Sequence, residues 1–137
     1  MEGIKKLNQV HKILDFHVTN NPDNVSVSVD SVSYTNSDIF LKVLSLVGLL
    51  KENKVTSGDR IAYLAKNSSE FIELMYASSI LGLVMVPINF RLAYEEVKFI
   101  IQDSGSKIII FGEEFKELVE KFNFDKTDLQ LSLGISE

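Results

Sequence analysis

Apolar positions in the first third of the chain change their spacing. Residues 5–18 carry apolar side chains at helical spacing, and an Asn-Asn-Pro run then predicts the end of that helix. Residues 25–29 read Val-Ser-Val-Ser-Val, an alternation that predicts a strand with one polar face. A second short strand is predicted over residues 32–34 after an Asp-Ser turn, so the sequence predicts a β-hairpin.

From residue 35 onwards, helices and short apolar strands alternate. Thr35 and Asp38 fit a capping box, in which the hydroxyl accepts the amide N–H three residues on and the carboxylate faces back. Helices are predicted to start near residues 35, 67, 93 and 113, and mostly buried strands are predicted over 60–65, 83–88 and 107–111. We expect the strand at 83–88 to end its pairing at Pro87.

This alternation predicts the fold class and its divisions. Short apolar strands joined by helices are typical of an α/β fold with a mainly parallel sheet and helices on both faces. We divide the chain into a helix and hairpin (1–34), βα units (35–122) and a tail (123–137). Within the tail, residues 129–133 are a candidate for one more strand.

Composition narrows the possible classes of protein. The chain has 137 residues, 45% of them hydrophobic, which is enough for a core of its own. The net charge of −5 and the lack of a Lys or Arg run argue against nucleic acid as a partner. Cysteine is absent, which excludes disulfides and thiolate chemistry.

Neither a signal peptide nor a membrane span is predicted. The first residues lack an apolar core with a cleavage site. The most apolar stretch, 80–88, contains Gly82 and Pro87 and is too short to cross a bilayer. We therefore expect a cytoplasmic domain.

Familiar catalytic motifs are missing. The sequence contains no dinucleotide-binding or phosphate-binding glycine loop and no nucleophile elbow. His11 and His17 would lie roughly 240° apart on a helix, so we expect no shared metal. The carboxylate pairs are interpreted as solvated starts of helices, which the helix dipole favours: Glu70 with Glu73, Glu95 with Glu96, Glu113 with Glu114.

Six short phrases nevertheless follow one another in a fixed order. They are T-N-S-D-I, G-D-R-I-A, N-S-S-E-F, G-L-V-M-V-P-I-N, R-L with E-E-V, and D-S-G-S-K, and they begin at Thr35, Gly58, Asn67, Gly82, Arg91 and Asp103. In this order and spacing the chain resembles the AMP-forming acyl-activating enzymes. The departures are Asn36, where the family favours Tyr, and Leu81, where it often has a small residue; both concern packing. The phrases mark the family's scaffold.

The resemblance implies a much longer parent enzyme. Members of the family run to several hundred residues, and their phosphate-gripping loop, ribose-binding Asp and catalytic Lys have no counterpart here. The resemblance therefore implies the N-terminal portion of the large N-terminal domain, which we expect to be inactive alone, with no catalytic, ATP-binding or metal residue. The parent would use ATP and Mg²⁺ to convert a carboxylate into an acyl-adenylate, and CoA to form a thioester.

The residues after Pro87 favour one branch of the family. Asn89-Phe90-Arg91 resembles the acyl-CoA synthetase form, whereas amino-acid-adenylating domains usually have Asp at the position of Asn89. A carboxylic acid of fatty acid metabolism is the implied substrate. Two alternatives stay open: an amino-acid-adenylating domain, and a free-standing flavodoxin-like interaction module. A receiver-like pocket is missing, because the predicted strands lack the required acidic ends.

Two further expectations concern partners. The resemblance implies that basic side chains after the strand at 107–111 approach the 3′-phosphate of CoA, and the candidates are Lys116 and Lys121. As part of a larger enzyme, the chain should also expose an apolar face or a strand edge. We expect it to self-associate there.

Overall fold

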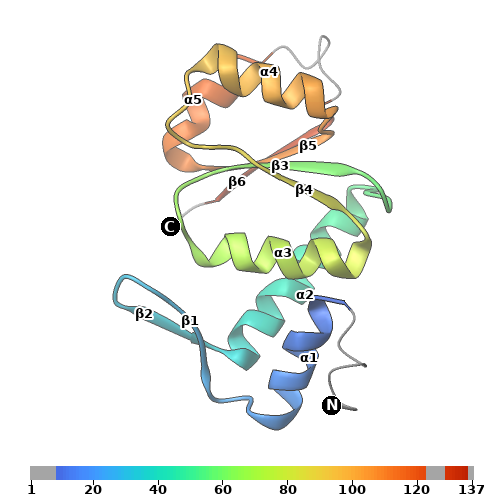
Figure 1. The fold of residues 1–137 in the computed structure, drawn as a ribbon, viewed down its shortest axis with the longest axis vertical. Helices are drawn as coiled ribbons and strands as arrows, with labels where there is room; N and C mark the ends of the chain where they lie inside the picture. The colour runs from blue at the N-terminus through green and yellow to red at the C-terminus, as the bar shows by residue number, and fades with distance from the viewer. Residues whose placement is uncertain (1–8, 123–128, 136–137) are drawn as a thin grey trace. The chain divides into compact units, whose positions relative to one another are not determined.

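The computed structural model describes residues 9–122 and 129–135, which form two compact units (Figure 1). Unit 1 contains the described residues up to 56 together with 68–82. Unit 2 contains residues 57–67, 83–122 and 129–135. The chain therefore leaves unit 1, returns to it for one helix, and then completes unit 2.

Unit 1 consists of three helices and a hairpin. Its elements are α1 (His11–Asn20), β1 (Val25–Val29), β2 (Val32–Thr35), α2 (Asn36–Glu52) and α3 (Ser69–Leu81). The helix predicted over 5–18 is confirmed from residue 11 onwards, and its residues 5–8 lie outside the described residues. The predicted hairpin is also confirmed.

Local signals set the ends of the elements in unit 1. The Thr35 hydroxyl accepts the Asp38 N–H at 3.1 Å, and the Asp38 carboxylate accepts the Thr35 N–H at 2.8 Å, which confirms the capping box. Helix α3 ends at Gly82, whose φ of 70° is a left-handed conformation that glycine adopts without strain. The two-residue turn of the hairpin has Asp30 at φ 52°.

Unit 2 is built on a parallel sheet of four strands in the order β4-β3-β5-β6. Its elements are β3 (Arg60–Leu64), β4 (Val84–Pro87), α4 (Tyr94–Ser104), β5 (Ile108–Gly112), the 3₁₀ helix η2 (Glu113–Phe115), α5 (Lys116–Val119) and β6 (Leu131–Ile135). The candidate strand at 129–133 thus exists as β6, two residues later. The α/β fold class is confirmed.

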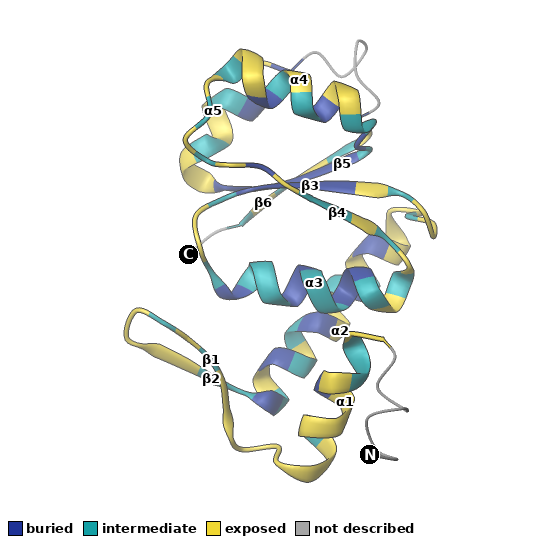
Figure 2. Cartoon of the chain, viewed as in Figure 1, coloured by how far each residue is buried: buried dark blue, intermediate teal, exposed yellow. Residues whose placement is uncertain are grey.

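The core of unit 2 lies between one face of the sheet and the helices α4 and α5 (Figures 1 and 2). It consists of apolar side chains that alternate along β3 and β5 and recur at helical spacing on α4: Ala62, Leu64, Ile109, Phe111, Val97, Ile101, Val119, Phe122 and Leu129. Side chains of the opposite face, such as Ile61 and Ile110, are buried as well. The prediction of a doubly buried strand at β3 is therefore confirmed.

Three sequence predictions about unit 2 are wrong in detail. Among the described residues strand β4 pairs with β3 alone, so it is an edge strand, and it is exposed at both ends. Pairing does not stop at Pro87, since the Ile88 N–H donates to the Tyr63 carbonyl at 2.9 Å; proline is tolerated because its missing donor lies on an edge. The helix predicted over 113–122 is split into η2 and a single α-turn, interrupted at Phe115.

No helix within the described residues combines the length and the apolar character that crossing a membrane requires.

Candidate functional site

The carboxyl end of the parallel sheet is the candidate site in unit 2. The chain runs from β3 to β4 on one side and then to β5 on the other side of β3. In open α/β sheets such a reversal leaves a crevice at the carboxyl ends of the strands, and ligands bind there. The segments that follow β3, β4 and β5 therefore carry the residues to consider.

Charged side chains meet where β3 and β5 end. Lys66, after β3, lies with its Nζ 3.8 Å from Oε1 of Glu114, and both side chains are largely exposed. Gly112 ends β5, and a Cβ at this position would collide with the Glu114 carboxylate. Glycine therefore allows this carboxylate to fold back over the end of the strand.

The two predicted CoA-phosphate residues differ in their surroundings. Lys116 begins α5, and its Nζ lies 3.4 Å from Oε1 of Glu113. Lys121 follows α5, is exposed, and makes no ion pair within the described residues. Its backbone carbonyl accepts the Tyr94 hydroxyl at 3.2 Å, so Lys121 has a fixed backbone beside α4. Neither lysine lines the unit 1 cavity or the unit 2 groove described below.

A third cation, Arg91, belongs to one of the six phrases but is not among the predicted site residues. It follows β4 in a turn where the Asn89 side-chain oxygen accepts the Arg91 N–H at 3.0 Å. The guanidinium lies over the Phe90 ring, 5.4 Å from its centroid. The Asn-x-Arg spacing is the signal that could have identified this ordered turn, because Asn side chains accept from the backbone two residues on.

The amino end of the same sheet is held by two of the six phrases. Lys107 Nζ contacts Asp59 Oδ1 at 2.6 Å, and Arg60 Nε donates to the Gly105 carbonyl at 3.3 Å. The G-D-R-I-A and D-S-G-S-K phrases thus fasten β3 to β5. Their polar residues act on the scaffold, as the sequence analysis expected.

One sequence interpretation is wrong in unit 1, namely that of Glu73 as part of a solvated carboxylate pair. Glu73 is not a solvated carboxylate: it is 7% exposed. It accepts the Ser69 hydroxyl at 2.9 Å and lies 3.2 Å from Lys42 Nζ. Helix α2 packs along α3 and brings Lys42 to this position, which helical spacing within α3 alone does not reveal.

The histidines of α1 are not brought together on a metal site. His11 Nδ1 and the Ser79 hydroxyl of α3 form a hydrogen bond of 3.0 Å, in which the tautomer of the imidazole sets the donor. His17 lines a different feature, described below. Within the described residues no cluster of three or more His, Asp or Glu side chains is arranged to bind a metal.

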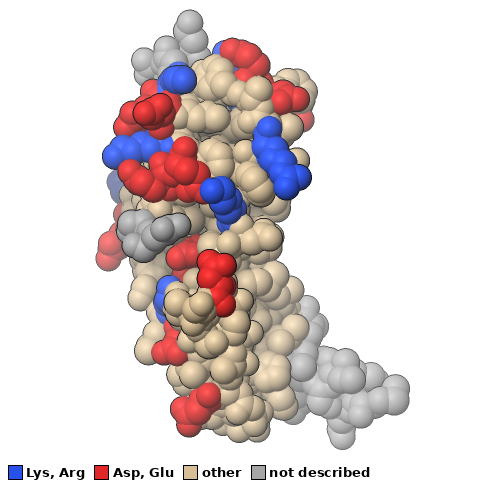
Figure 3. Space-filling model, turned by 90° about the vertical axis from the view of Figure 1, so that its left-hand side faces the viewer, with Lys and Arg blue, Asp and Glu red and all other residues tan. Residues whose placement is uncertain are grey.

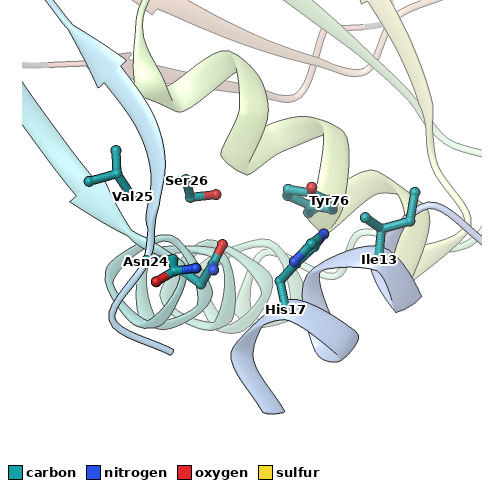
Figure 4. A pocket seen from close by; sticks show the side chains of 7 residues that line it. Ile13, His17, Asn24, Val25, Ser26 and Tyr76 are labelled. Atoms are coloured by element: carbon teal, nitrogen blue, oxygen red, sulfur yellow. The ribbon is translucent and has the colours of Figure 1, made fainter. Parts of the chain in front are cut away.

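Unit 1 has a cavity of about 340 Å³ with a neutral lining (Figure 4). The half-buried Tyr76 of α3 lies on one side, and burial raises the pKa of its phenol. Asn24 and the first two residues of β1, Val25 and Ser26, lie on the other side, and the Ser26 side chain points toward Tyr76. The lining residues are Ile13, His17, Asn24, Val25, Ser26, Asn36 and Tyr76.

Unit 2 has an apolar groove of about 410 Å³ along α4. Leu92, Phe99 and Ile100 line it, with Glu95 and Glu96 at its side. Neither this groove nor the unit 1 cavity contains a nucleophile paired with a base. On the face shown in Figure 3, acidic and basic side chains are interspersed.

Comparison with known proteins identifies the family. The model of the AMP-binding enzyme family matches residues 14–134, and the chain belongs to this family. The resemblance to AMP-forming acyl-activating enzymes is thereby confirmed.

Individual relatives are acyl ligases. The chain is 31% identical over 121 residues to the fatty acid–[acyl-carrier-protein] ligase ScoC of Streptomyces coeruleorubidus, covering 88% of this chain and 23% of that protein. It is 51% identical over 70 residues to the long-chain-fatty-acid–CoA ligase FadD13 of Mycobacterium tuberculosis, covering 51% of this chain and 13% of the relative.

Solved structures agree. A putative long-chain-fatty-acid CoA ligase of Rhodopseudomonas palustris superposes with a TM-score of 0.87 at 26% identity, covering 94% of this chain and 33% of that chain. A fatty acyl CoA synthetase of Mycobacterium tuberculosis gives a TM-score of 0.85 at 31% identity. This match covers 95% of the present chain and 27% of the synthetase chain. The matched part of the chain spans less than a quarter of the length of the two ligases ScoC and FadD13.

Proposed function

We propose that this chain is the amino-terminal part of a cytoplasmic, ATP-dependent acyl-CoA synthetase of fatty acid metabolism. The enzyme would join a carboxylate to AMP with release of pyrophosphate, and then transfer the acyl group to the CoA thiol. The ordered phrases and the similarity to fatty acid ligases support this proposal. Asn89 after β4 favours CoA synthetases over amino-acid-adenylating domains, which usually have Asp at this position.

The chain alone is proposed to be inactive. The phosphate loop, ribose-binding Asp and catalytic Lys of the family have no counterpart in its sequence. Within the described residues there is also no carboxylate set for the Mg²⁺ that would offset phosphate charge. ATP, Mg²⁺ and the transition state would be bound by segments of the enzyme other than this one.

Two measurements test whether the chain alone is inactive and lacks the ATP site. The purified 137-residue chain, given ATP, Mg²⁺ and a panel of fatty acids, should release no pyrophosphate. Titration calorimetry should detect no ATP binding. Micromolar ATP affinity would show that the nucleotide site lies in this chain and contradict the proposal.

CoA is proposed to contact this chain through its 3′-phosphate, at Lys121 and Lys116. Lys121 should contribute more, because Lys116 is already close to Glu113. Arg91, which stands on an ordered turn without a carboxylate partner within the described residues, is a third candidate. Arginine forms strong, directional hydrogen bonds to phosphate.

The test uses the full-length enzyme. Lys121→Ala, Lys116→Ala and Arg91→Ala are compared by their KM for CoA and for dephospho-CoA, with Lys98→Ala as a matched control on α4. A residue that contacts the 3′-phosphate should raise KM for CoA several-fold and leave KM for dephospho-CoA nearly unchanged. An equal change in KM for CoA and for dephospho-CoA would show that the residue does not contact the 3′-phosphate.

The remaining partners follow from the same proposal. The carboxylic acid and CoA are substrates of the whole enzyme, and nucleic acid is not expected to bind. Self-association through an exposed apolar surface or strand edge is also proposed for this chain.

A further inference from the structure

The apolar groove of unit 2 follows the axis of α4. Its lining residues stand at positions i, i+3, i+4, i+7 and i+8 of one stripe: Leu92, Glu95, Glu96, Phe99 and Ile100. This is the spacing of the face that one amphipathic helix turns toward its neighbour. The groove therefore has the pattern that suits a second helix laid along α4.

Phe99 is the apolar centre of this groove. It is 64% exposed, the largest exposed fraction among the large apolar side chains of the described residues. Its neighbours Leu92 and Ile100 are half-buried and pack against the core of unit 2. Val97 and Ile101 of the same helix are 0% and 1% exposed, so α4 is well packed and Phe99 lies on its unpartnered side.

The charge of the groove is acidic. Two glutamates line it, and neither Lys nor Arg does. The Glu96 carboxylate accepts the Ala93 N–H at 2.8 Å, which holds this carboxylate at the start of α4. The Glu95 side chain is 78% exposed, and its contact with Lys98 Nζ is 3.7 Å long. Such exposed pairs are weak, so a basic side chain of a partner can compete for Glu95.

A third carboxylate extends this acidic border. Asp103 is exposed and follows Phe99 by four residues, which places it on the same side of α4. Phe99 thus has carboxylates at i−4, i−3 and i+4. The ammonium of Lys98 lies over the Tyr94 ring, 5.7 Å from its centroid. A partner of the groove must accordingly bring apolar surface and positive charge together.

We propose that the α4 groove binds an amphipathic helix of a partner protein. The apolar stripe of that helix covers Phe99, and Lys or Arg side chains beside the stripe meet Glu95, Glu96 and Asp103. Docking of an amphipathic helix in an apolar groove is a common mode of recognition. An acidic helix would be repelled, and a wholly apolar one would take water from the carboxylates without replacing it. This interface needs no part of the proposed ligase activity.

The first test uses two labelled synthetic helical peptides of about 18 residues, long enough to span α4. Both carry leucine at the same positions, and the remaining positions are lysine in one peptide and glutamate in the other. Fluorescence polarisation with the 137-residue chain should show binding of the Leu/Lys peptide, weakened by salt, and binding about tenfold weaker or less for the Leu/Glu peptide. No binding of the Leu/Lys peptide, or equal binding of both, would overturn the proposal.

The second test places the peptide on the groove. Phe99→Ala should weaken binding of the Leu/Lys peptide about tenfold or more. Phe16→Ala is the matched control, because Phe16 is 50% exposed and belongs to unit 1. It should bind the peptide as the wild type does. Equal affinities of the two variants would overturn the proposal, and far-ultraviolet circular dichroism checks that both are folded.

The acidic border is tested separately. Glu95→Gln and Asp103→Asn should each weaken binding of the Leu/Lys peptide several-fold and reduce its dependence on salt. Glu96 is left unchanged, because its carboxylate also accepts the Ala93 N–H at the start of α4. Unchanged affinity and salt dependence in the double variant would contradict the role of charge.

Other occupants of the groove give different results. The Leu/Lys peptide should also bind the full-length enzyme; binding to the 137-residue chain alone would overturn the proposal and assign the groove to another segment of the same polypeptide. A wild-type dimer that Phe99→Ala dissociates would assign it to a second copy. Vesicles of phosphatidylserine should not bind the chain, since the carboxylates repel an anionic surface. Vesicle binding that Phe99→Ala abolishes would replace the partner helix by a membrane.

Discussion

In unit 2, the strands β3 and β5 keep nearly every apolar side chain from water, and α4 and α5 close one face of the sheet. In unit 1, apolar side chains of α1, α2 and the hairpin stay exposed. Among the described residues, nine of the eleven large exposed apolar side chains belong to unit 1, including Phe16, Leu41 and Val25. Both units bury apolar side chains, such as Ile39, Val43 and Leu74 in unit 1, but unit 1 also leaves most of the large exposed ones at its surface.

The difference indicates where partners can act. Exposed apolar side chains that gather on neighbouring elements mark surfaces for association. Unit 1 has such side chains, together with a cavity whose lining contains no Lys, Arg, Asp or Glu. Unit 2 instead has paired charges, Lys66 and Glu114, at the carboxyl end of its sheet.

Both units contain long-range polar contacts, such as His11–Ser79 and Lys42–Glu73 in unit 1, and two contacts of very different range can be compared. In unit 2, Asp59 and Lys107 are 48 residues apart and join two strands. In unit 1, the capping box joins residues only three apart. Unit 2 should therefore respond most to the loss of a distant partner, and the start of α2 to the loss of a local one.

The largest expected effect tests burial in unit 2. Ile101→Ala should lower the free energy of unfolding by about 2–5 kcal/mol, because it removes a buried side chain and leaves a cavity. Phe99→Ala is the matched control on the same helix, since Phe99 is 64% exposed and Ile101 only 1%. It should cost within about 0.5 kcal/mol. Urea unfolding measures the free energy of unfolding of both variants. Similar losses of stability would show that burial does not distinguish Ile101 from Phe99.

The next effect tests the long-range ion pair. Lys107→Met should cost about 1–3 kcal/mol, because it leaves the Asp59 carboxylate, whose side chain is only 11% exposed, without its charged partner. Lys98→Met removes a lysine whose partner Glu95 is 78% exposed, and should cost about 0–1 kcal/mol. Equal unfolding free energies for the two variants would show that the Asp59–Lys107 contact is ordinary surface charge.

A smaller effect tests the local signal in unit 1. Thr35→Ala should lower stability by about 0.5–2 kcal/mol, since the Asp38 N–H loses its hydroxyl acceptor. Thr35→Ser retains the hydroxyl and should lose much less. Thermal and urea unfolding distinguish the two. A serine variant as unstable as the alanine variant would assign the effect to the lost methyl group.

The smallest effect is a dependence on pH. Hydrogen bonds from the Thr35 backbone, and then from its side chain, lower the pKa of Asp38 below its ordinary value of 3.8. A lowered pKa in the folded state means that stability is present above the ordinary pKa and is lost as pH falls through the folded pKa. The advantage of the wild type over Asp38→Asn should therefore be constant near neutral pH and shrink below about pH 4. A constant difference down to pH 2 would show that the carboxylate contributes nothing.

The sequence by itself determined the features that depend on neighbours along the chain. Thr35 and Asp38 predict their capping box, and Gly82 predicts the end of α3, because both depend on a few consecutive residues. The alternation at 25–29 predicts β1. The ordered phrases from Thr35 to Lys107 identify the family, since their spacing needs no coordinates.

Only the tertiary structure decided which distant residues meet. The burial of Glu73 depends on α2 bringing Lys42 to it, and the edge position of β4 depends on the strand order. The same holds for the Tyr94 hydroxyl, which donates to the carbonyl of Lys121, 27 residues further along the chain. A pattern along the chain reports the period of one element and not the neighbour that its side chains meet. The cavity between Tyr76 and Asn24, whose residues are some fifty positions apart, could be seen only when the elements were placed side by side.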